Sequence, residues 1–407
     1  MINPKNISAK EYNYTLPEDK IARYPLNERD ASKLLIYDQG RIKKEIFRNI
    51  PDYIQDDYLL VFNNAEVVYS RLIFKKETGA KIEIFCLEPI EPQEYNLAFQ
   101  SNKKTTWRCL VGNLKKWKTG ELKKEISVNE KITILTARKK QRDNNYVDIE
   151  FSWDNQNITF SDILDHSGIV PIPPYLKRDS EKIDKTRYQT IYSRVKGSVA
   201  APTAGLHFTK SVMNKLKENN IPFSEITLHV GAGTFRPVKA ETVAEHEMHT
   251  EHFSVSLKTI EELIENQKKI LAIGTTSVRT LESLYWLGQK INNFNSPNDD
   301  RIKLNQWDHL ELPSEISLKE SLNHIAEHLQ VNQLESLNAS TQIMITPGYQ
   351  FKVIDAMVTN FHQPQSTLLM LIGAFVGEDW KKIYQFALNN DFRFLSYGDS
   401  SLLFPKK

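Results

Sequence analysis

The chain has 407 residues, more than one compact domain usually holds, so its length favours two domains. Hydrophobic residues make up 40% of it and charged residues 26%, and no run approaches the ~18 apolar residues of a transmembrane helix, so we expect no membrane-spanning segment. The formal net charge of +2, the missing signal-peptide pattern and two cysteines without metal-type spacing argue against a strongly basic, a secreted or a cysteine-metal protein, and we expect a cytoplasmic location.

The first half of the chain predicts mostly strands. Residues 57–74 hold two apolar runs separated by a polar break, which indicates strand, turn and strand. From 71 to 152, short strand-like segments alternate with turn residues, a pattern typical of a small all-β barrel or sandwich. We therefore expect a small all-β unit, a barrel or a sandwich, over about residues 71–152; the resemblance described below implies an inserted barrel domain.

The same region is basic. Residues 101–142 contain thirteen lysines and arginines and three glutamates. Such a surface attracts a phosphate backbone, but an ordinary solvated surface explains the composition equally well. The candidate RNA-binding residues are Lys115, Lys116 and Lys118.

Helical and strand patterns alternate after residue 156. Helices are predicted at 158–168, 209–220, 258–269, 275–289, 316–330 and 365–376, and strands at 224–230, 270–274, 342–346 and 353–361. Thr275 or Thr276 is the expected N-cap of its helix. This alternation is typical of an α/β layer. We expect a discontinuous α/β catalytic domain with a mixed central sheet, residues 1–70 and 153–407, carrying an insertion at about 288–340.

Two segments of small residues lie beside histidines. In "TLHVGAGTF" (227–235) a glycine-rich loop follows a strand, so its backbone N–H groups could face a ligand, although a tight turn explains it too. In "AAPTAGLHF" (200–208) small residues allow a close approach beside His207. The alternative for His207 is a hydrogen-bonded structural imidazole.

Three further histidines, His246, His249 and His252, recur at a spacing of three, which would align them along one helix face. This is not a recognised zinc-binding spacing, and no metal site is expected. Neutral imidazoles suit acid–base chemistry near pH 7. A surface position without any chemistry is the alternative.

Polar side chains also gather where strands end, and ligands of α/β folds bind at such ends. Thr275 and Thr276 begin a helix whose N–H groups suit an anion, and Arg279 could clamp a carboxylate, unless it only pairs with Glu282. Further polar residues of this kind are Asn360, His362, Tyr397 and Asp399. From the residues alone, we expect an α/β enzyme with a site built from several loops.

In these segments the chain resembles the S-adenosylmethionine:tRNA ribosyltransferase-isomerases of queuosine biosynthesis. The resemblance lies in ordered blocks such as "IARYPLNERDASKLL", "GSVAAPTAGLHFT", "TLHVGAGTFRPV", "GTTSVRTLES" and "FRFLSYGDS". They cover most of the chain outside the predicted barrel and the 288–340 insertion.

The resemblance implies a specific reaction. The ribosyl part of S-adenosylmethionine, the co-substrate, is transferred and isomerised onto the aminomethyl group of preQ1 at the wobble position of tRNA, giving epoxyqueuosine-tRNA, adenine and methionine. It also implies an α/β domain with an inserted β-barrel, no metal, and, we expect, a monomer. The acid–base candidates are His207, His229 and His249. The candidate substrate-binding residues are Gly205, Gly231, Gly233, Thr234, Thr275, Thr276, Arg279, Asn360, His362, Tyr397 and Asp399.

One block departs from the family. The family usually reads "FNDTRVxPARL", and this chain reads "FNNAEVVYSRL", with Asn64, Ala65, Glu66 and Tyr69 at the changed positions. Two alternatives therefore stand beside the first hypothesis. One is an enzyme of the same fold that uses S-adenosylmethionine on another acceptor, and the other is a non-catalytic RNA-binding protein.

Overall fold

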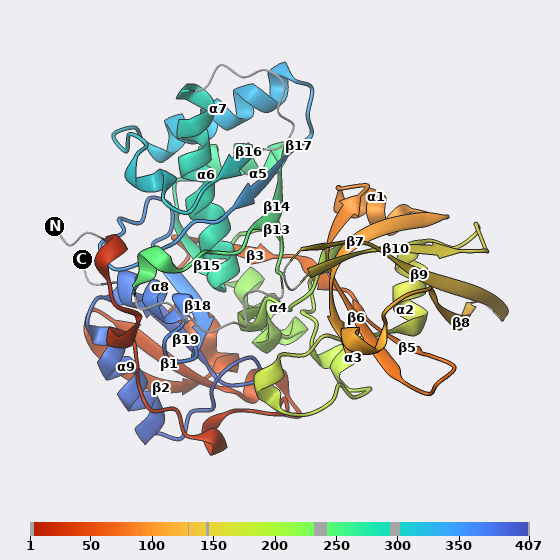
Figure 1. Ribbon diagram of the computed structural model, residues 1–407. Coiled ribbons are helices and arrows are strands. Elements are labelled where there is room, and N and C mark those ends of the chain that lie inside the picture. Colours follow the sequence, from red (N-terminus) through yellow and green to blue (C-terminus); the bar gives the residue numbers. More distant parts are fainter. Residues whose placement is uncertain (1–3, 129, 144–145, 232–241, 294–301, 406–407) are drawn as a thin grey trace.

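Two β-sheets organise the computed structural model, which describes residues 4–128, 130–143, 146–231, 242–293 and 302–405 (Figure 1). Within these residues the larger sheet has ten strands in the order β16-β17-β14-β13-β3-β15-β18-β19-β1-β2. Their bounds are β1 (Lys33–Asp38), β2 (Arg41–Ile46), β3 (Tyr58–Asn63), β13 (Phe223–His229), β14 (Glu251–Ser256), β15 (Lys269–Ile273), β16 (Ile302–Leu304), β17 (Ser336–Thr341), β18 (Ala356–Asn360) and β19 (Ser400–Phe404). The expected mixed central sheet is confirmed.

Four neighbouring strands at the centre, β13, β3, β15 and β18, run parallel. They are buried on both faces, because Leu59 and Val61 of β3 point into one hydrophobic core and Leu60 and Phe62 into another. The carboxyl ends of parallel strands share one edge of the sheet. Asn63, His229, Ile273 and Asn360 therefore end at the same edge.

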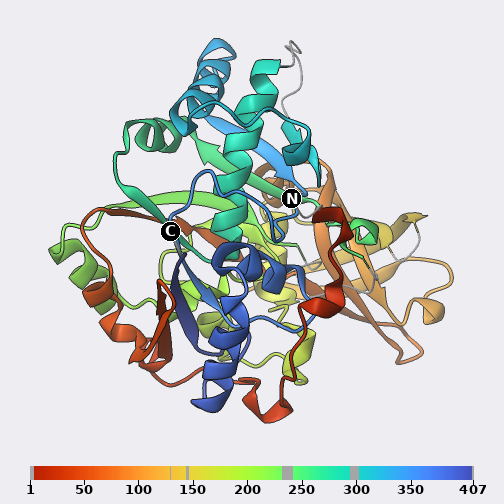
Figure 2. The same ribbon diagram turned by 90° about the vertical axis from the view of Figure 1, so that its left-hand side faces the viewer.

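Helices cover both faces of this sheet. One face carries α5 (Leu257–Glu265), α6 (Thr275–Asn293), α7 (Leu318–Val331), α8 (Thr367–Val376) and α9 (Asp379–Asn389), and the other carries α4 (Lys210–Glu218). Figure 2 shows α8 and α9, in blue, over the near face. Thr209, Ser256 and Ser366 cap α4, α5 and α8 through their hydroxyl groups, as expected of N-cap residues.

The second sheet is antiparallel and curls like half a barrel, in the order β11-β5-β6-β7-β10-β9-β8. Its strands are β5 (Arg71–Lys75), β6 (Lys81–Glu91), β7 (Lys104–Gly112), β8 (Leu122–Val128), β9 (Lys131–Asp143), β10 (Tyr146–Trp153) and β11 (Gly168–Ile169). In the described residues no hydrogen-bonded ladder joins β8 to β5. The coarser expectation, a smaller all-β unit beside the α/β unit, is confirmed, whereas a closed barrel is not seen.

Short elements connect the two sheets. Helix α2 (Phe160–Ser167) follows β10 and packs Phe160, Ile163 and Leu164 into the core of the curled sheet. Helix α1 (Tyr95–Gln100) lies between β6 and β7, helix α3 (Asp184–Arg187) follows a turn at Pro174–Leu176, and β4 (Ala65–Val67) pairs with β12 (Val195–Ser198). The curled unit thus continues beyond residue 152, and the domain division at 71–152 stays a prediction.

Two expected elements are wrong. His246 and His249 lie in an irregular segment and His252 lies in β14, so the three histidines do not share a helix. The alternating burial of Phe253 and Val255, which period-2 patterning explains, overrides the spacing of three. The strand expected at 342–346 is irregular, and the strand is the preceding segment, β17.

The segment at 288–340 is part of the main unit. Helix α6 continues through residue 288 to Asn293, β16 and β17 extend the main sheet, and α7 packs its buried face into the main core. The expectation of an insertion here is therefore refined: the described part of the segment adds strands and a helix to the existing layers.

Candidate functional site

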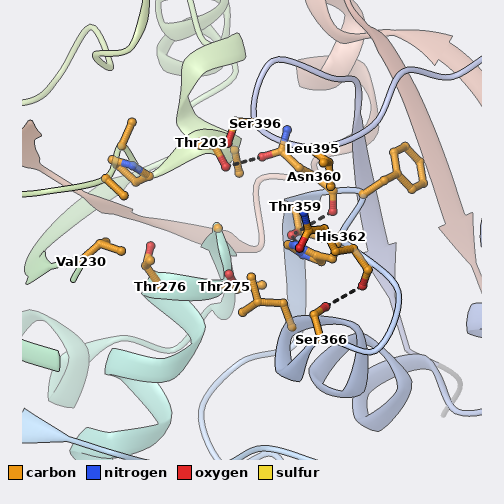
Figure 3. Close-up of a pocket in the computed structure, with 18 of the residues that line it drawn as sticks. Thr203, Val230, Thr275, Thr276, Thr359, Asn360, His362, Ser366, Leu395 and Ser396 are labelled. Carbon is orange, nitrogen blue, oxygen red and sulfur yellow. Dashed lines mark hydrogen bonds between the residues drawn. The ribbon is translucent and has the colours of Figure 1, made fainter. Parts of the chain in front are cut away.

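A cleft opens at the carboxyl edge of the parallel strands. Figure 3 shows Thr276 and Val230 on one side of it, and Asn360 and His362 on the other. Its lining comes from the ends of β13, β15 and β18 and from two loops: Tyr175, 200–204, Val230, 274–276, 359–363, Ser366, Leu368, Leu395 and Ser396. A cleft at the carboxyl ends of parallel strands is where small molecules commonly bind in α/β folds.

The end of β15 shapes one wall of the cleft. Gly274 has a φ of 89°, which glycine adopts without strain, so α6 begins directly after the strand. The Gly274 carbonyl accepts from the Val278 N–H. Gly274 therefore holds the N-cap position, and the expectation that Thr275 or Thr276 caps α6 is wrong. Both threonines stand in its first turn, where N–H groups are free of intrahelical partners.

Thr276 offers the cleft an unused hydroxyl group. Its Oγ1 is buried and has no hydrogen-bond partner among the residues that the structure describes. A buried hydroxyl without a partner is unfavourable, so it is a natural contact for a ligand.

Asn360 is held in one orientation at the opposite wall. Thr203 Oγ1 donates to Asn360 Oδ1 at 2.8 Å (Figure 3). The amide nitrogen therefore points to His207 Nε2 at 3.2 Å, and to the carbonyl of Asp399 at 3.4 Å. His207 accepts through Nε2, so its Nδ1 carries the proton and donates to Ser32 Oγ at 2.8 Å.

His207 consequently stands behind the cleft. Its ring is buried against Phe47, and burial lowers its pKa to about 3. Since both ring nitrogens already have partners, the geometry favours the structural alternative: His207 positions Asn360.

His362 lines the cleft itself. Its Nε2 lies 2.9 Å from Thr359 Oγ1, and its backbone N–H donates to Tyr384 Oη at 3.0 Å. Burial lowers the pKa of His362 to about 3, so the imidazole is neutral at pH 7. A neutral imidazole here can form hydrogen bonds with a bound heterocycle.

The glycines proposed for the site have different surroundings. A Cβ on Gly205 would lie 1.9 Å from Tyr192 Oη, so this glycine permits close packing and does not face the cleft. Gly231 follows Val230 at the cleft, and a Cβ there would meet nothing within 4 Å. Gly233 and Thr234 lie outside the described residues.

Tyr397 and Asp399 lie beside the cleft and do not line it. Tyr397 Oη donates to Asp184 Oδ1 at 2.7 Å, and Arg178 pairs with the same carboxylate. Asp399 accepts the backbone N–H groups of Lys33 at 3.0 Å and Arg393 at 2.8 Å. Because these polar groups are already bonded within the protein, both residues hold the loop around the site and are not oriented to a ligand.

Arg279 pairs with Glu251, and the alternative pairing with Glu282 is wrong. Glu251 also lies 3.1 Å from His249 Nε2, so His249 is joined to the same buried network. Glu282 instead accepts backbone N–H groups from 352–354. Arg279 and His249 do not line the cleft. Arg279 Nε and Nη2 are nevertheless buried without partners in the described part of the chain.

His229 lines a second cavity, between α1 and the strands β13, β14 and β17. Its ring stacks on Tyr95 with centroids 4.4 Å apart and planes at 11°. Burial and the neighbouring His252 lower the pKa of His229 to about 4. Its Nδ1 is buried and has no hydrogen-bond partner in the described ranges.

A model of the family described as queuosine biosynthesis protein matches residues 9–403. The chain belongs to this family. It is 38% identical over 400 residues to the S-adenosylmethionine:tRNA ribosyltransferase-isomerase of Trichlorobacter lovleyi, an alignment that covers 97% of this chain and 99% of the relative. It is 36% identical over 404 residues to the enzyme of the same name from Halothermothrix orenii, covering 98% and 100%.

A solved S-adenosylmethionine tRNA ribosyltransferase from Thermotoga maritima is also similar to this chain. It is 28% identical, with a TM-score of 0.44, and the match covers 96% of this chain and 99% of the other.

Basic residues of the chain gather on the curled sheet. Lys115, Lys116 and Lys118 are exposed and line a surface hollow together with Lys139, Lys140 and Arg142. No acidic residue lines the described part of this hollow. Such a surface is suited to a phosphate backbone.

Among the described residues there is neither a metal-binding cluster nor a membrane-spanning helix. No group of three His, Cys, Asp or Glu side chains there could hold a metal ion. No helix in those ranges is long and apolar enough to cross a membrane.

Sequence reasoning missed several lining residues, including Thr203, Thr359 and Ser366. Thr203 lies in the segment 200–208, which was selected because it contains His207. Its hydroxyl group, beside small residues in that segment, could have indicated a binding residue. Ser366 caps α8 through its Oγ, so its pattern indicated a helix start. Thr359 looks like an ordinary strand residue until β18 is known to end at the cleft.

Proposed function

We propose that this chain transfers and isomerises the ribosyl part of S-adenosylmethionine onto preQ1 at the wobble position of tRNA, releasing adenine and methionine. The name of its relatives, which are 34–38% identical over nearly the whole chain, supports this proposal. The structural observation that carries it is the cleft at the ends of β13, β15 and β18, where Thr276, Asn360 and His362 converge.

The start of α6 suits the methionine end of the donor. A helix of 19 residues presents free N–H groups and a partial positive charge at its first turn. Thr275 and Thr276 stand in that turn, and the Thr276 hydroxyl has no other partner in the described chain. A carboxylate bound here receives several hydrogen bonds without a charged side chain.

The opposite wall suits the nucleoside end. Asn360 presents an amide whose orientation Thr203 and His207 fix, and fixed polar groups give an orientation to a bound sugar or base. Neutral His362 is a candidate hydrogen-bond partner for the adenine, which must leave during the reaction.

The changed residues in "FNNAEVVYSRL" lie outside this cleft. Asn64 Nδ2 donates to Glu225 Oε2 at 2.9 Å, and Asn64 Oδ1 accepts from Thr227 Oγ1 at 2.7 Å, so Asn64 ties the end of β3 to β13. Ala65 is buried in β4, and Glu66 is half-buried beside it. The departure therefore leaves the donor cleft of the proposal intact.

The decisive assay incubates the purified chain with S-adenosylmethionine and preQ1-containing tRNA. We expect adenine and methionine to appear in equal amounts, with one modified nucleotide formed per adenine released. Adenine release only with another RNA or small acceptor would favour a different reaction on the same donor. RNA binding without any adenine release would favour a non-catalytic RNA-binding protein and contradict the proposal.

A further inference from the structure

We propose that the cavity between α1 and the strands β13, β14 and β17 holds the acceptor base, and that His229 removes a proton from its amine. This inference rests on the proposed function. It adds a second site to the donor cleft and gives one histidine a catalytic role.

The cavity wall is a polar patch on one face of the sheet. In the strand register Thr227 lies opposite Ser254, and Ser254 lies opposite Asn338. The next row of the same face holds His229, His252 and Ser340. The residues between these rows, such as Leu228 and Phe253, point into the core on the other face.

This patch matches the edge of a base and not a phosphate. Hydroxyl and amide groups can donate and accept hydrogen bonds with a heterocycle. The charged side chain that lines the described cavity is Glu94, which would attract a cationic amine and repel phosphate. Phosphates suit the basic hollow on the curled sheet instead.

Consecutive residues at the end of β13 line the cavity and the donor cleft. His229 lines the cavity and Val230, the next residue, lines the cleft. Consecutive Cα atoms are about 3.8 Å apart. Because neighbouring strand residues point to opposite faces of the sheet, an amine beside His229 would reach a ribosyl group in the cleft around the carboxyl end of β13.

The basic hollow lies at the other end of β7. This strand begins at Lys104, shortly after α1 ends, and its last residue, Gly112, directly precedes the hollow. At ~3.3 Å per residue its nine residues span about 30 Å. An RNA stem lying along β7 could place phosphates on the lysines and one unpaired base in the cavity.

His229 is a neutral imidazole and can accept a proton, and its pKa of about 4 makes the transfer from an ammonium group an uphill, transient step. The Gly197 backbone lies against Nδ1 of His229, so Nε2 is the ring nitrogen left to take the proton, whereas both nitrogens of His207 are occupied. In the step, an N–H bond of the ammonium group breaks, the electron pair stays on the amine nitrogen, and the proton moves to the imidazole. The imidazolium then releases that proton to solvent.

The first test is Asn338→Ala, because Asn338 is exposed and its loss should leave the fold intact. We expect the KM for preQ1-tRNA to rise about tenfold and the Kd for S-adenosylmethionine to stay unchanged. The matched control is Thr276→Val in the cleft. It should raise the Kd for S-adenosylmethionine and leave the KM for preQ1-tRNA unchanged. An unchanged KM for the tRNA in Asn338→Ala would overturn the cavity assignment.

The second test is His229→Gln, which keeps a hydrogen-bonding side chain but cannot take up the proton. We expect kcat to fall about 10²-fold at pH 7, with S-adenosylmethionine binding retained. The deficit should shrink as pH rises, since more of the amine is then deprotonated in solution. The titratable groups that share the cavity with His229 are His252, Tyr95 and Glu94, and they remain in both proteins.

The two proposals fail differently. A deficit that is constant with pH, or an unchanged kcat, would overturn the role of His229. A wild-type chain that releases no adenine with preQ1-tRNA would instead overturn the proposed function. Melting curves of both variants and their binding of S-adenosylmethionine report whether the fold is kept.

Discussion

Two neighbouring residues at the start of α6 make opposite use of their hydroxyl groups. Ser277 is fully buried, and its Oγ donates to the Ile273 carbonyl at 2.8 Å. Thr276 lines the cleft, and its Oγ1 has no partner in the described chain. An unpartnered buried hydroxyl costs about 1–3 kcal/mol, which a ligand that bonds to it would recover. Ser277 thus serves the fold, and Thr276 is available for binding.

We expect Thr276→Val to weaken S-adenosylmethionine binding about fivefold to tenfold without lowering the free energy of unfolding, because it removes a hydroxyl that only the ligand uses. Ser277→Ala is the matched control, and should lower stability by about 1 kcal/mol with unchanged binding. Calorimetric titration and denaturant unfolding measure the two quantities. If Thr276→Val and the wild type bound S-adenosylmethionine equally well, the Thr276 hydroxyl would not contact the ligand.

At the scale of elements, close contact between helices ties residues 288–340 to the main core. A Cβ on Gly288 of α6 would lie 2.0 Å from the Ser321 carbonyl oxygen of α7. Such a distance requires the two helices to move apart. The Ser321 hydroxyl also donates to the Tyr285 carbonyl, so the helices are bonded to each other at this point.

We expect Gly288→Ala to destabilise the protein by roughly 2–4 kcal/mol, although alanine in a helix interior ordinarily stabilises by about 1 kcal/mol. Asn292→Ala, at an exposed position of the same helix, should change stability by less than about 0.5 kcal/mol. Thermal and urea unfolding measure both. If Gly288→Ala were neutral, the two helices would not pack as closely as described.

Over the whole molecule, positive charge is concentrated on the curled sheet although the net charge is only +2. The hollow there brings together lysines of two separate segments, 115–118 and 139–140. Its charge would act on RNA independently of sequence, because phosphate contacts release counterions.

Reversing Lys115, Lys116 and Lys118 to Glu should weaken tRNA binding and reduce the slope of log K against log salt by about three. Lys210, Lys217 and Lys258 are exposed on the main unit, and their reversal gives the same change of net charge. That control should leave the slope nearly unchanged. Filter binding at several salt concentrations measures it, and equal slopes for the two triple variants would argue against the hollow.

Buried neutral histidines also give the whole fold a pH dependence. Burial lowers the pKa of His207 and His362 to about 3, and of His229 and His309 to about 4. The unfolded chain, with histidine pKa values near 6.5, binds more protons below that pH, so stability rises with pH across this window and falls on acidification.

We expect the free energy of unfolding to fall between pH 6.5 and 4.5, with each of these histidines contributing about 1.4 kcal/mol per pH unit. His309 packs against Trp286 and Tyr349 and lines neither cavity. His309→Gln should therefore reduce the slope of the unfolding free energy against pH by about that amount. Urea unfolding across the pH range measures it. A slope identical to wild type would show that His309 titrates normally in the folded protein.

The sequence allowed the layers and the strand-end residues to be predicted, because they follow local rules. Asn360 ends an apolar strand and Thr276 and His362 come shortly after one, and parallel strands bring such residues to one edge. The partners of each side chain could not be predicted. His207 and His362 have equivalent sequence settings, yet only His362 lines the cleft, since Ser32, remote in sequence, binds the ring of His207. The spacing of three between histidines wrongly predicted a helix, because contacts remote in sequence also decide here. Pairing with β13 and β17 makes the segment at 251–256 a strand, β14.

The central claim is that S-adenosylmethionine binds in the cleft at the carboxyl edge of the main sheet. A crystal structure of the chain with S-adenosylmethionine tests it most directly. The account predicts the methionine carboxylate at the first turn of α6, within hydrogen-bonding distance of Thr276, and the nucleoside beside Asn360 and His362. A donor bound elsewhere, with this cleft empty, would contradict it.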